Sequence, residues 1–284
     1  MPDVRISSPA LQERLTAHLQ AVVRERHPDH APAGHADVRT YIDRELARYG
    51  PVAMHEFDHR GRAHRNLILD LPGQRSGGRV LVGAHYDAVP GSPGADDNGS
   101  ALAVLLELAR EFSMRPARMP LRLVAFDLEE ADRAGSRAYA GTLRQRRERV
   151  DLMISLEMLG YKDSRPGSQR YPPGLAYLYP DRGDFIALIG NLRTLPSLRR
   201  LAVSMRQAVP CEFLAVPFRG RMLPATRRSD HSSFWDLGFP ALMVTDTANM
   251  RNPHYHKPSD RIETLDIGFL AAVCSGLTRA LSAF

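Results

Sequence analysis

One stretch in the first half of the chain constrains the fold more than any other. Residues 79–83 contain the short apolar run Val80-Leu81-Val82 with two β-branched valines, and they predict a buried strand. The residues after Asn98 carry leucine and alanine at helical spacing, so a helix is expected from there to about Phe112. The loop between the two is rich in proline and glycine and contains His85 and Asp87. In open α/β sheets, a loop of this kind at the carboxyl end of a strand forms part of a ligand-binding crevice.

Predicted strands and helices alternate along the rest of the chain. This alternation predicts an α/β fold with a largely parallel sheet covered by helices on both faces. No internal repeat, low-complexity segment or linker interrupts the 284 residues, so we expect one domain, 1–284, with the helices of residues 1–60 packing on its edge. The expected strands are 66–71, 121–128, 151–156 and 240–245, and the expected helices are 11–26, 38–49, 135–149, 197–207 and 263–281.

The composition argues against several classes of function. The formal net charge is +6, but the arginines that produce it are scattered or interleaved with other side chains, so no nucleic-acid partner is expected. No apolar run approaches the length of a membrane span, and residues 1–6 lack the pattern of a signal peptide. Cys211 and Cys274 are the only cysteines, so one bridge is possible but no disulfide framework is needed. A cytoplasmic protein with no membrane partner is therefore expected.

The first 65 residues are rich in histidine. These histidines share no pattern of neighbouring carboxylates, so the sequence gives no reason to group them in a site. We interpret all of them as surface or capping residues: His18, His27, His30, His35, His55, His59 and His64.

Polar side chains stand at four predicted strand ends. Neighbouring residues of a regular strand point to opposite faces, so two adjacent acids can serve one site only where the strand has ended. Carboxylates that are crowded together repel one another unless a cation neutralises them. Histidines combined with carboxylates suit Zn²⁺, which accepts nitrogen and oxygen ligands and leaves a position for water. The residues at these strand ends are His85, Glu129-Glu130, Glu157 and His256, with Asp97 in the loop after the first.

Each of these signals alone has a plainer explanation. A histidine at a strand end is more often a satisfied polar residue than a ligand, and Asp96-Asp97 could cap the following helix. Glu129-Glu130 alone would most often be solvated acids. Glu157 is harder to explain without a partner, because it ends a strand that is expected to be buried. The prediction of a metal site therefore depends on the joint order of these residues.

That joint order resembles a known family, the co-catalytic zinc aminopeptidases. The family includes bacterial leucyl aminopeptidases and aminopeptidase S, and it is related to glutamate carboxypeptidase II. The resemblance runs from about Asn66 to the C-terminus, and the first sixty or so residues add nothing to it. The segments that carry it are His85-Tyr86-Asp87, Gly94-Ala95-Asp96-Asp97-Asn98-Gly99-Ser100, Phe126-Asp127-Leu128-Glu129-Glu130 with Gly135-Ser136, Ser229-Asp230-His231-Ser232-Ser233-Phe234, and Tyr255-His256 with Asp260.

The resemblance implies a three-layer α/β/α sandwich around a mixed, largely parallel sheet, as in zinc exopeptidases. It also implies two Zn²⁺ ions bridged by one aspartate. By the same resemblance, Asp97 is the bridging ligand and His85 binds one of the ions. The remaining ligands are Glu130, Glu157 and His256, and which ion each of them binds stays open.

The resemblance assigns catalytic roles to three further residues. Glu129 is the general base that takes a proton from the metal-bound water. Asp87 holds His85 through the nitrogen that does not bind metal, which is a common way of fixing a ligating imidazole. Tyr255 matches a tyrosine that helps to stabilise the tetrahedral oxyanion in some members. The family often has a cis peptide bond at the position of Asp97-Asn98.

The sequence departs from the family pattern at two positions. Glu157 stands where the family usually has aspartate, and the extra methylene predicts a second metal that sits differently or binds more weakly. Ala101 replaces a common glycine and is expected to matter less. The motifs do not explain the segment Gly160–Asn191. We expect it to shape the substrate pocket, with Tyr171, Tyr177 and Tyr179 as a wall of the cleft.

The most direct expectation is a zinc exopeptidase, an aminopeptidase acting on short peptides or amino-acid amides. Two alternatives stay open. A glutaminyl cyclase shares the fold and much of the ligand order but uses one zinc, and Tyr255 argues against it because cyclases tend to have tryptophan there. A non-catalytic binding domain of the same fold is disfavoured because every ligand position keeps a residue able to bind zinc. The substrate side-chain preference, the group that binds the substrate amine and the oligomeric state cannot be predicted from the sequence.

Overall fold

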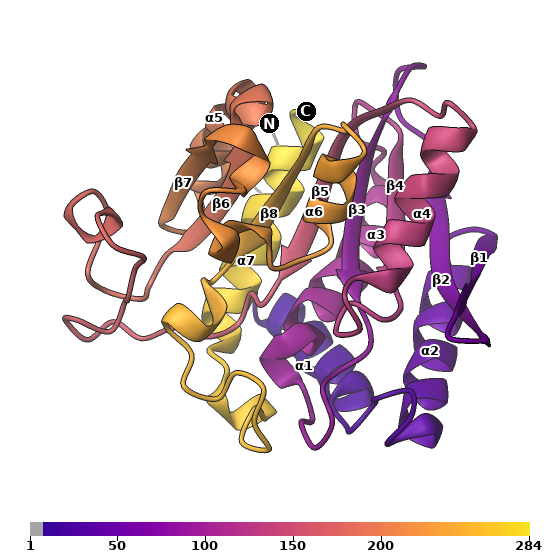
Figure 1. Ribbon diagram of the computed structural model, residues 1–284, viewed down its shortest axis with the longest axis horizontal. Helices are drawn as coiled ribbons and strands as arrows, with labels where there is room; N and C mark the ends of the chain where they lie inside the picture. Colours follow the sequence, from indigo (N-terminus) through magenta and orange to yellow (C-terminus); the bar gives the residue numbers. More distant parts are fainter. Residues whose placement is uncertain (1–7) are drawn as a thin grey trace.

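A mixed sheet of eight strands forms the centre of the computed structural model, which describes residues 8–284. The strand order is β1-β2-β4-β3-β5-β8-β6-β7, and the four central strands β4, β3, β5 and β8 are parallel (Figure 1). Toward the edges, β2 pairs antiparallel with β4 and β1, and β6 pairs antiparallel with β8. The predicted fold class is confirmed. The strands are β1 Val52–His59, β2 Arg62–Leu71, β3 Arg79–His85, β4 Leu121–Phe126, β5 Val150–Glu157, β6 Ile186–Asn191, β7 Cys211–Val216 and β8 Ala241–Thr245.

Helices cover both faces of the sheet, and the alternation of side chains along the strands decides which residues each layer contacts. Val80 and Val82 of β3 join a core with α1, α2, α3, α5 and α7, whereas Leu81 points to the opposite core with α4 and α6. The chain therefore forms three layers, with α4 and α6 on the near side of the sheet (Figure 1). The helices are α1 Pro9–Val22, α2 Pro32–Ala47, α3 Ala101–Met114, α4 Ala134–Gln145, α5 Leu195–Met205, α6 His231–Asp236 and α7 Ile267–Ser282.

The structure adds three strands that the sequence did not predict: β1, β6 and β7. β1 is only half-buried, and its register with β2 over eight residue pairs, rather than a hydrophobic pattern of its own, holds it in the sheet. Helix boundaries also differ by a few residues. The helix expected to reach Arg149 ends at Gln145, because Arg147 is left-handed with φ 53° and the amide of Glu148 donates back to the carbonyl of Leu143.

The interpretation of the early histidines as surface or capping residues was wrong for four of them. The rings of His18 and His55 are partly buried and form hydrogen bonds with Tyr41 and Thr142, and His35 and His64 contact a buried carboxylate. His35 of α2 is buried, and its Nε2 lies 2.7 Å from Oδ1 of Asp127, while Nδ1 of His64 on β2 lies 3.1 Å from the other carboxylate oxygen. Asp127 directly follows β4, the neighbour of β2, so the sheet brings His64 and Asp127 together, and the packing of α2 on β2 adds His35. His27 does act as a cap, because its Nδ1 accepts hydrogen bonds from the amides of Asp29 and His30.

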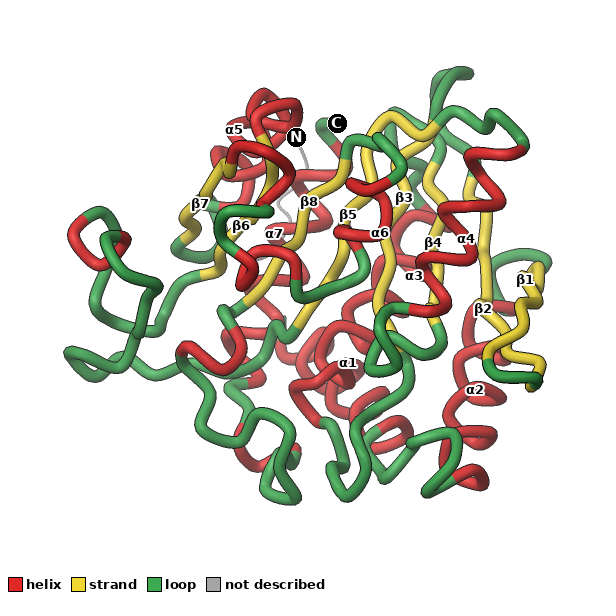
Figure 2. The backbone as a smooth tube through the Cα atoms, viewed as in Figure 1, coloured by secondary structure: helices red, strands yellow, loops and turns green. Residues whose placement is uncertain are grey.

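A long excursion between β5 and β6 extends away from the sheet at the left of the molecule (Figures 1 and 2). Apart from short turns and one isolated bridge between Asp163 and Gly183, it has no regular secondary structure. Cys211 and Cys274 are both buried and free. None of the helices within residues 8–284 combines the length and the apolar character needed to cross a membrane. The absence of a signal peptide was predicted from residues 1–6, which lie outside the described residues, and the cytoplasmic location stays a prediction.

Candidate metal centre

The carboxyl ends of the parallel strands bring the predicted ligands together at one edge of the sheet. His85 is the last residue of β3 and Glu157 is the last residue of β5, the strand beside it. Glu130 follows β4 on the other side of β3, and His256 lies in the loop after β8. Because neighbouring parallel strands end at the same edge, four separate segments contribute to one cluster.

Asp97 lies at the centre of this cluster, and each of its two carboxylate oxygens faces a different pair of side chains, one histidine and one glutamate. Its Oδ1 lies 3.3 Å from Nε2 of His85, which lies 3.7 Å from Oε1 of Glu157. Its Oδ2 lies 3.1 Å from Nε2 of His256, which lies 3.3 Å from Oε1 of Glu130. Each group thus offers one imidazole and one glutamate, and the two share a single aspartate. This arrangement fits two cations bridged by one carboxylate.

Three buried atoms of the cluster lie close to other polar atoms but form no hydrogen bond of acceptable geometry with any residue from 8 to 284: Nε2 of His85, Oδ1 of Asp97 and Oε1 of Glu130. Buried polar atoms of native proteins nearly always have partners, so these atoms call for an explanation. The same three residues each supply a ligand atom, and these atoms all lie within 4.8 Å of one another. Imidazole nitrogen and carboxylate oxygen are ligands that zinc accepts, so the residues present fit a zinc site.

The charges of the cluster also fit a bound cation. Burial, followed by the charge of Asp97, raises the pKa of Glu130 to about 7. Burial alone would raise the pKa of Asp97, but close contacts with His256 and His85 outweigh it and lower that pKa. Burial alone would lower the pKa of His256, whereas contacts with Asp97 and Glu130 raise it to about 10. Positive charge on the histidines thus balances the negative charge of the carboxylates. Divalent cations bound in the same place would supply this positive charge instead.

Asp87 organises the two segments on which the cluster depends. Its Oδ1 accepts a hydrogen bond from the amide of Glu129 at 3.0 Å, and its Oδ2 accepts one from the amide of Glu130 at 3.1 Å. The same carboxylate lies 3.3 Å from Nδ1 of His85, the nitrogen that faces away from Asp97. The two adjacent glutamates stand in a turn beyond the end of β4, as the sequence argument required. Nδ1 of His85 also lies 3.2 Å from the backbone carbonyl oxygen of Asp87, so both the carboxylate and the backbone of this residue face the ring. That Asp87 orients His85 for metal binding stays a prediction.

Glu129 faces the cluster without being tied to it. The amide of Glu129 is held by Asp87, but among the described residues its carboxylate takes part in no hydrogen bond or ion pair. Burial, with the nearby carboxylates of Glu157 and Glu130, raises the pKa of Glu129 well above its usual value, although His85 opposes this effect. A carboxylate that is desolvated and free of partners is suited to exchange a proton with a substrate or a water.

The turn that carries Asp97 is held by side chains that the sequence did not single out as positioning groups. Asp260 accepts hydrogen bonds from the amides of Asp96 and Asp97 through its two oxygens. The side chain of Asn98 donates to the carbonyl of Leu156 and accepts from the amide of Met158, which ties the turn to the end of β5. The Asp97-Asn98 peptide bond is cis, as expected.

Two further groups near the cluster were missed. Ser229 donates to Oε2 of Glu157 at 2.7 Å and is itself bonded to Ser155, so the longer glutamate side chain has a partner behind it. Arg26 is fully buried and donates to carbonyl oxygens of the loops around His85 and Asp97. The motif Ser229-Asp230-His231 could have pointed to Ser229. No pattern in the sequence marked Arg26.

Tyr255 lies between the cluster and a pocket. Its ring stacks on that of His256 with centroids 3.7 Å apart, and its hydroxyl accepts a hydrogen bond from Arg228 at 3.2 Å. Tyr255 and Glu157 both line the pocket, so the pocket opens directly beside the candidate metal ligands.

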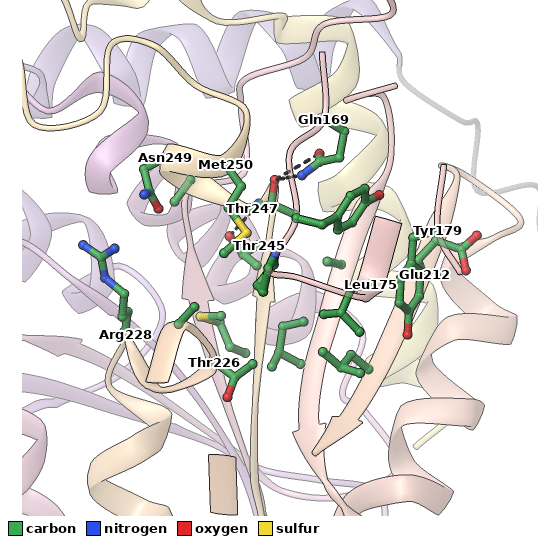
Figure 3. A pocket seen from close by; sticks show the side chains of 18 of the residues that line it. Gln169, Leu175, Tyr179, Glu212, Thr226, Arg228, Thr245, Thr247, Asn249 and Met250 are labelled. Carbon is green, nitrogen blue, oxygen red and sulfur yellow. Dashed lines mark hydrogen bonds between the residues drawn. The ribbon is translucent and has the colours of Figure 1, made fainter. Parts of the chain in front are cut away.

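The pocket is open to solvent, covers about 860 Å³ with this open part included, and has a mainly apolar lining. Leu175 and Tyr179 from the long excursion face side chains of β6, β7 and β8, and Gln169 is fixed by hydrogen bonds to Thr247 (Figure 3). Tyr171 and Tyr179 thus form part of the predicted wall, but Tyr177 does not: its side chain is 94% exposed and lies outside the lining. The apolar lining includes Tyr171, Leu175, Tyr179, Phe185, Phe213 and Leu223.

Comparison with known proteins connects this geometry to a family. A family model described as peptidase family M28 matches residues 66–280. The chain is 34% identical to the uncharacterized protein YfbL of Escherichia coli over 98% of this chain and 88% of that protein. It is 28% identical to leucine aminopeptidase 1 of Trichophyton equinum, over 78% of this chain and 57% of that protein.

A solved structure gives the corresponding result for the fold. The structure of BSAP, a zinc aminopeptidase from Bacillus subtilis, superposes on 79% of this chain and 51% of its own with a TM-score of 0.56 and 25% identity. This chain therefore spans little more than half the length of these two aminopeptidases.

Proposed function

Because the chain belongs to peptidase family M28, we propose that it is a two-zinc aminopeptidase that removes N-terminal residues from short peptides or hydrolyses amino-acid amides. The family expected from the motifs is confirmed, and with it the class of metallo-peptidase. One observation carries the finer proposal. Asp97 offers one carboxylate oxygen to the pair His85 and Glu157 and the other to the pair His256 and Glu130.

In this proposal each zinc ion is held by one histidine and one glutamate, and Asp97 bridges the two. When bound, such a pair of cations acidifies a water and polarises the scissile carbonyl. Asp87 keeps Nε2 of His85 directed at the cluster by facing Nδ1 of the same ring, and Ser229 supports Glu157 from behind.

Glu129 would be the general base. Its carboxylate has no hydrogen-bond or ion-pair partner within residues 8–284, and its backbone amide donates a hydrogen bond to Asp87 that holds the residue beside the cluster. It would accept a proton from the attacking water and return it to the amine that leaves. Tyr255, stacked on His256 at the border of the pocket, would donate a hydrogen bond to the oxyanion that develops on the carbonyl.

The pocket would receive the side chain of the N-terminal residue. It opens beside Glu157 and Tyr255, and its aromatic and aliphatic lining favours an apolar side chain. The free amino group of the substrate would lie near the carboxylate of Glu157, which lines the pocket, and near that of Glu130 in the same cluster.

The test is mass spectrometry of a mixed library of short peptides after incubation with zinc-loaded protein. We expect stepwise loss of N-terminal residues, with kcat lower by about 10²–10⁴-fold in Glu129→Gln, because proton transfer contributes that much to such reactions. Glu56→Gln, an exposed glutamate on β1, is the matched control and should keep wild-type activity.

The other outcomes are also informative. Loss of C-terminal residues would retain the hydrolytic centre and refute the aminopeptidase. Loss of ammonia from N-terminal glutamine would identify a cyclase. Full activity in Glu129→Gln, with its zinc content intact, would refute the role given to this residue. A wild-type protein that binds zinc and leaves every peptide unchanged would contradict the proposal as a whole.

A further inference from the structure

We propose that Arg26 is a positioning residue of the metal centre, and that its guanidinium fixes the turn that presents Asp97. This inference rests on the proposed zinc site. It makes the N-terminal segment, which lies outside the matched residues 66–280, a working part of the centre.

The first observation is the burial of Arg26. It follows α1 in the chain, and its side chain is 0% exposed. Arginine is almost never fully buried unless it is paired, because removing its charge from water is unfavourable. Arg26 forms no ion pair within 4 Å of a carboxylate among residues 8–284, so hydrogen bonds to carbonyl groups, together with the nearby charges of Asp97 and Asp260, compensate for its burial.

The second observation is where these hydrogen bonds go. Nε donates to the carbonyl of Tyr86 at 2.9 Å, and Nη2 donates to the carbonyls of Gly94 at 2.8 Å and Asp97 at 3.3 Å. Nη1 donates to the carbonyl of Pro93 and, at 3.3 Å, to those of Val22 and Arg24. One planar group thus connects the end of α1 with the segment between the two ligands His85 and Asp97.

The third observation is the fit of the guanidinium inside the turn. Gly94 is left-handed with φ 62°, and a Cβ at this position would lie 2.3 Å from the carbonyl oxygen of Asp97 and 2.7 Å from Nη2 of Arg26. The turn is therefore closed around Arg26 with no space for a larger residue at Gly94. The guanidinium fork has five N–H donors in a fixed plane, so it can hold several carbonyls at set positions, which a lysine ammonium cannot do.

An alternative is that Arg26 only attaches α1 to the body of the protein. The apolar residues of α1 already make that attachment, because Leu15, Leu19 and Val22 are buried in the main core. Four of the six carbonyls that Arg26 holds lie in the segment 86–97, including those of Tyr86, which follows the ligand His85, and of Asp97 itself. Groups that orient metal ligands in this way typically change metal affinity or activity by 10–100-fold when they are replaced.

The experiment measures zinc dissociation constants by competition with a chromogenic chelator, for wild-type protein, Arg26→Gln and Arg26→Lys. We expect at least one of the two zinc ions to bind tenfold or more weakly in both variants. Arg26→Lys retains the positive charge and loses the planar fork, so weaker binding in this variant assigns the effect to geometry rather than charge. It also carries the test if Arg26→Gln does not fold.

Arg24→Gln is the matched control, because Arg24 lies two residues away, is exposed and pairs with Asp37. It should bind zinc as the wild type does. Melting temperatures of the zinc-free proteins separate the two roles: lower melting temperatures with unchanged zinc binding in both Arg26 variants would overturn the inference. If the wild type itself bound no zinc, the proposed function would be refuted. If the wild type and all variants bound zinc equally, only the role given to Arg26 would be refuted.

Discussion

Two regions at the same end of the sheet are built in opposite ways. In the metal centre, buried polar side chains hold the backbone of the loops: Asp87 binds two successive amides, Asp260 binds two more, and Arg26 binds the carbonyls between His85 and Asp97. The adjoining pocket has mainly apolar walls, and the long excursion that contributes one of them has little regular secondary structure.

The difference reflects what each region has to do. Ligand atoms have to be held within a fraction of an ångström for a metal site to work, and hydrogen bonds to the backbone achieve this. A pocket for an apolar side chain needs volume and water exclusion, which hydrophobic walls supply without exact angles. Substitutions in the two regions should therefore change different quantities.

Of the substitutions that test this difference between the two regions, Asp87→Asn is expected to have the largest effect on kcat. The substitution keeps the shape of the side chain but replaces one acceptor oxygen by an NH₂ group, which would face the amide of Glu129 or Glu130. We expect kcat to fall by about 10–100-fold, and by the same factor for every peptide, because the change affects the common chemistry. Steady-state kinetics with peptides that have different N-terminal residues measures this. A loss confined to some side chains would break the distinction between the two regions.

A smaller effect is expected in the pocket. Ile189 of β6 lines it and is only partly buried, so Ile189→Phe should fill part of the space without disturbing the core. We expect the ratio of kcat/KM between peptides with N-terminal leucine and alanine to fall by about tenfold, a typical value for a steric change in an apolar pocket. Zinc content should stay the same. Ile189→Val is the matched control, with a ratio within about threefold of the wild type. Equal losses for both peptides would show that the pocket does not select the side chain.

The metal centre and the pocket also differ in how much of each could be predicted from the sequence. Three candidate ligands could be grouped from the sequence because His85, Glu130 and Glu157 end or closely follow neighbouring parallel strands, whose ends the sheet brings together. Asp97 and His256 stand in the loops beyond the strands, and only their short motifs marked them. Arg26 was not predictable, because its partners are backbone carbonyls, which leave no trace in residue identity. The contact of His35 and His64 with Asp127 was missed for a related reason: it depends on the packing of α2 over β2 rather than on spacing along the chain.

The pocket was predictable only in outline. A tyrosine-rich segment suggested a wall, but the side chain of Tyr177 points to solvent while those of Tyr171 and Tyr179 line the cavity. The facing walls come from β6 and β7, two strands that the sequence pattern did not reveal. Short apolar segments such as these look much the same whether they form strands or helices, so their place is decided by tertiary packing.

The most direct test of the account is a count of zinc ions per chain, by native mass spectrometry, for wild-type protein and Asp97→Asn. If Asp97 bridges two ions, the wild type carries two and the variant, which has lost one of the two anionic oxygens, carries at most one. Peptide hydrolysis should fall by at least about 10²-fold in the variant, because the proposed chemistry uses both ions. A wild type that binds a single ion at saturating zinc, or an Asp97→Asn protein that keeps two ions and full activity, would contradict the central claim.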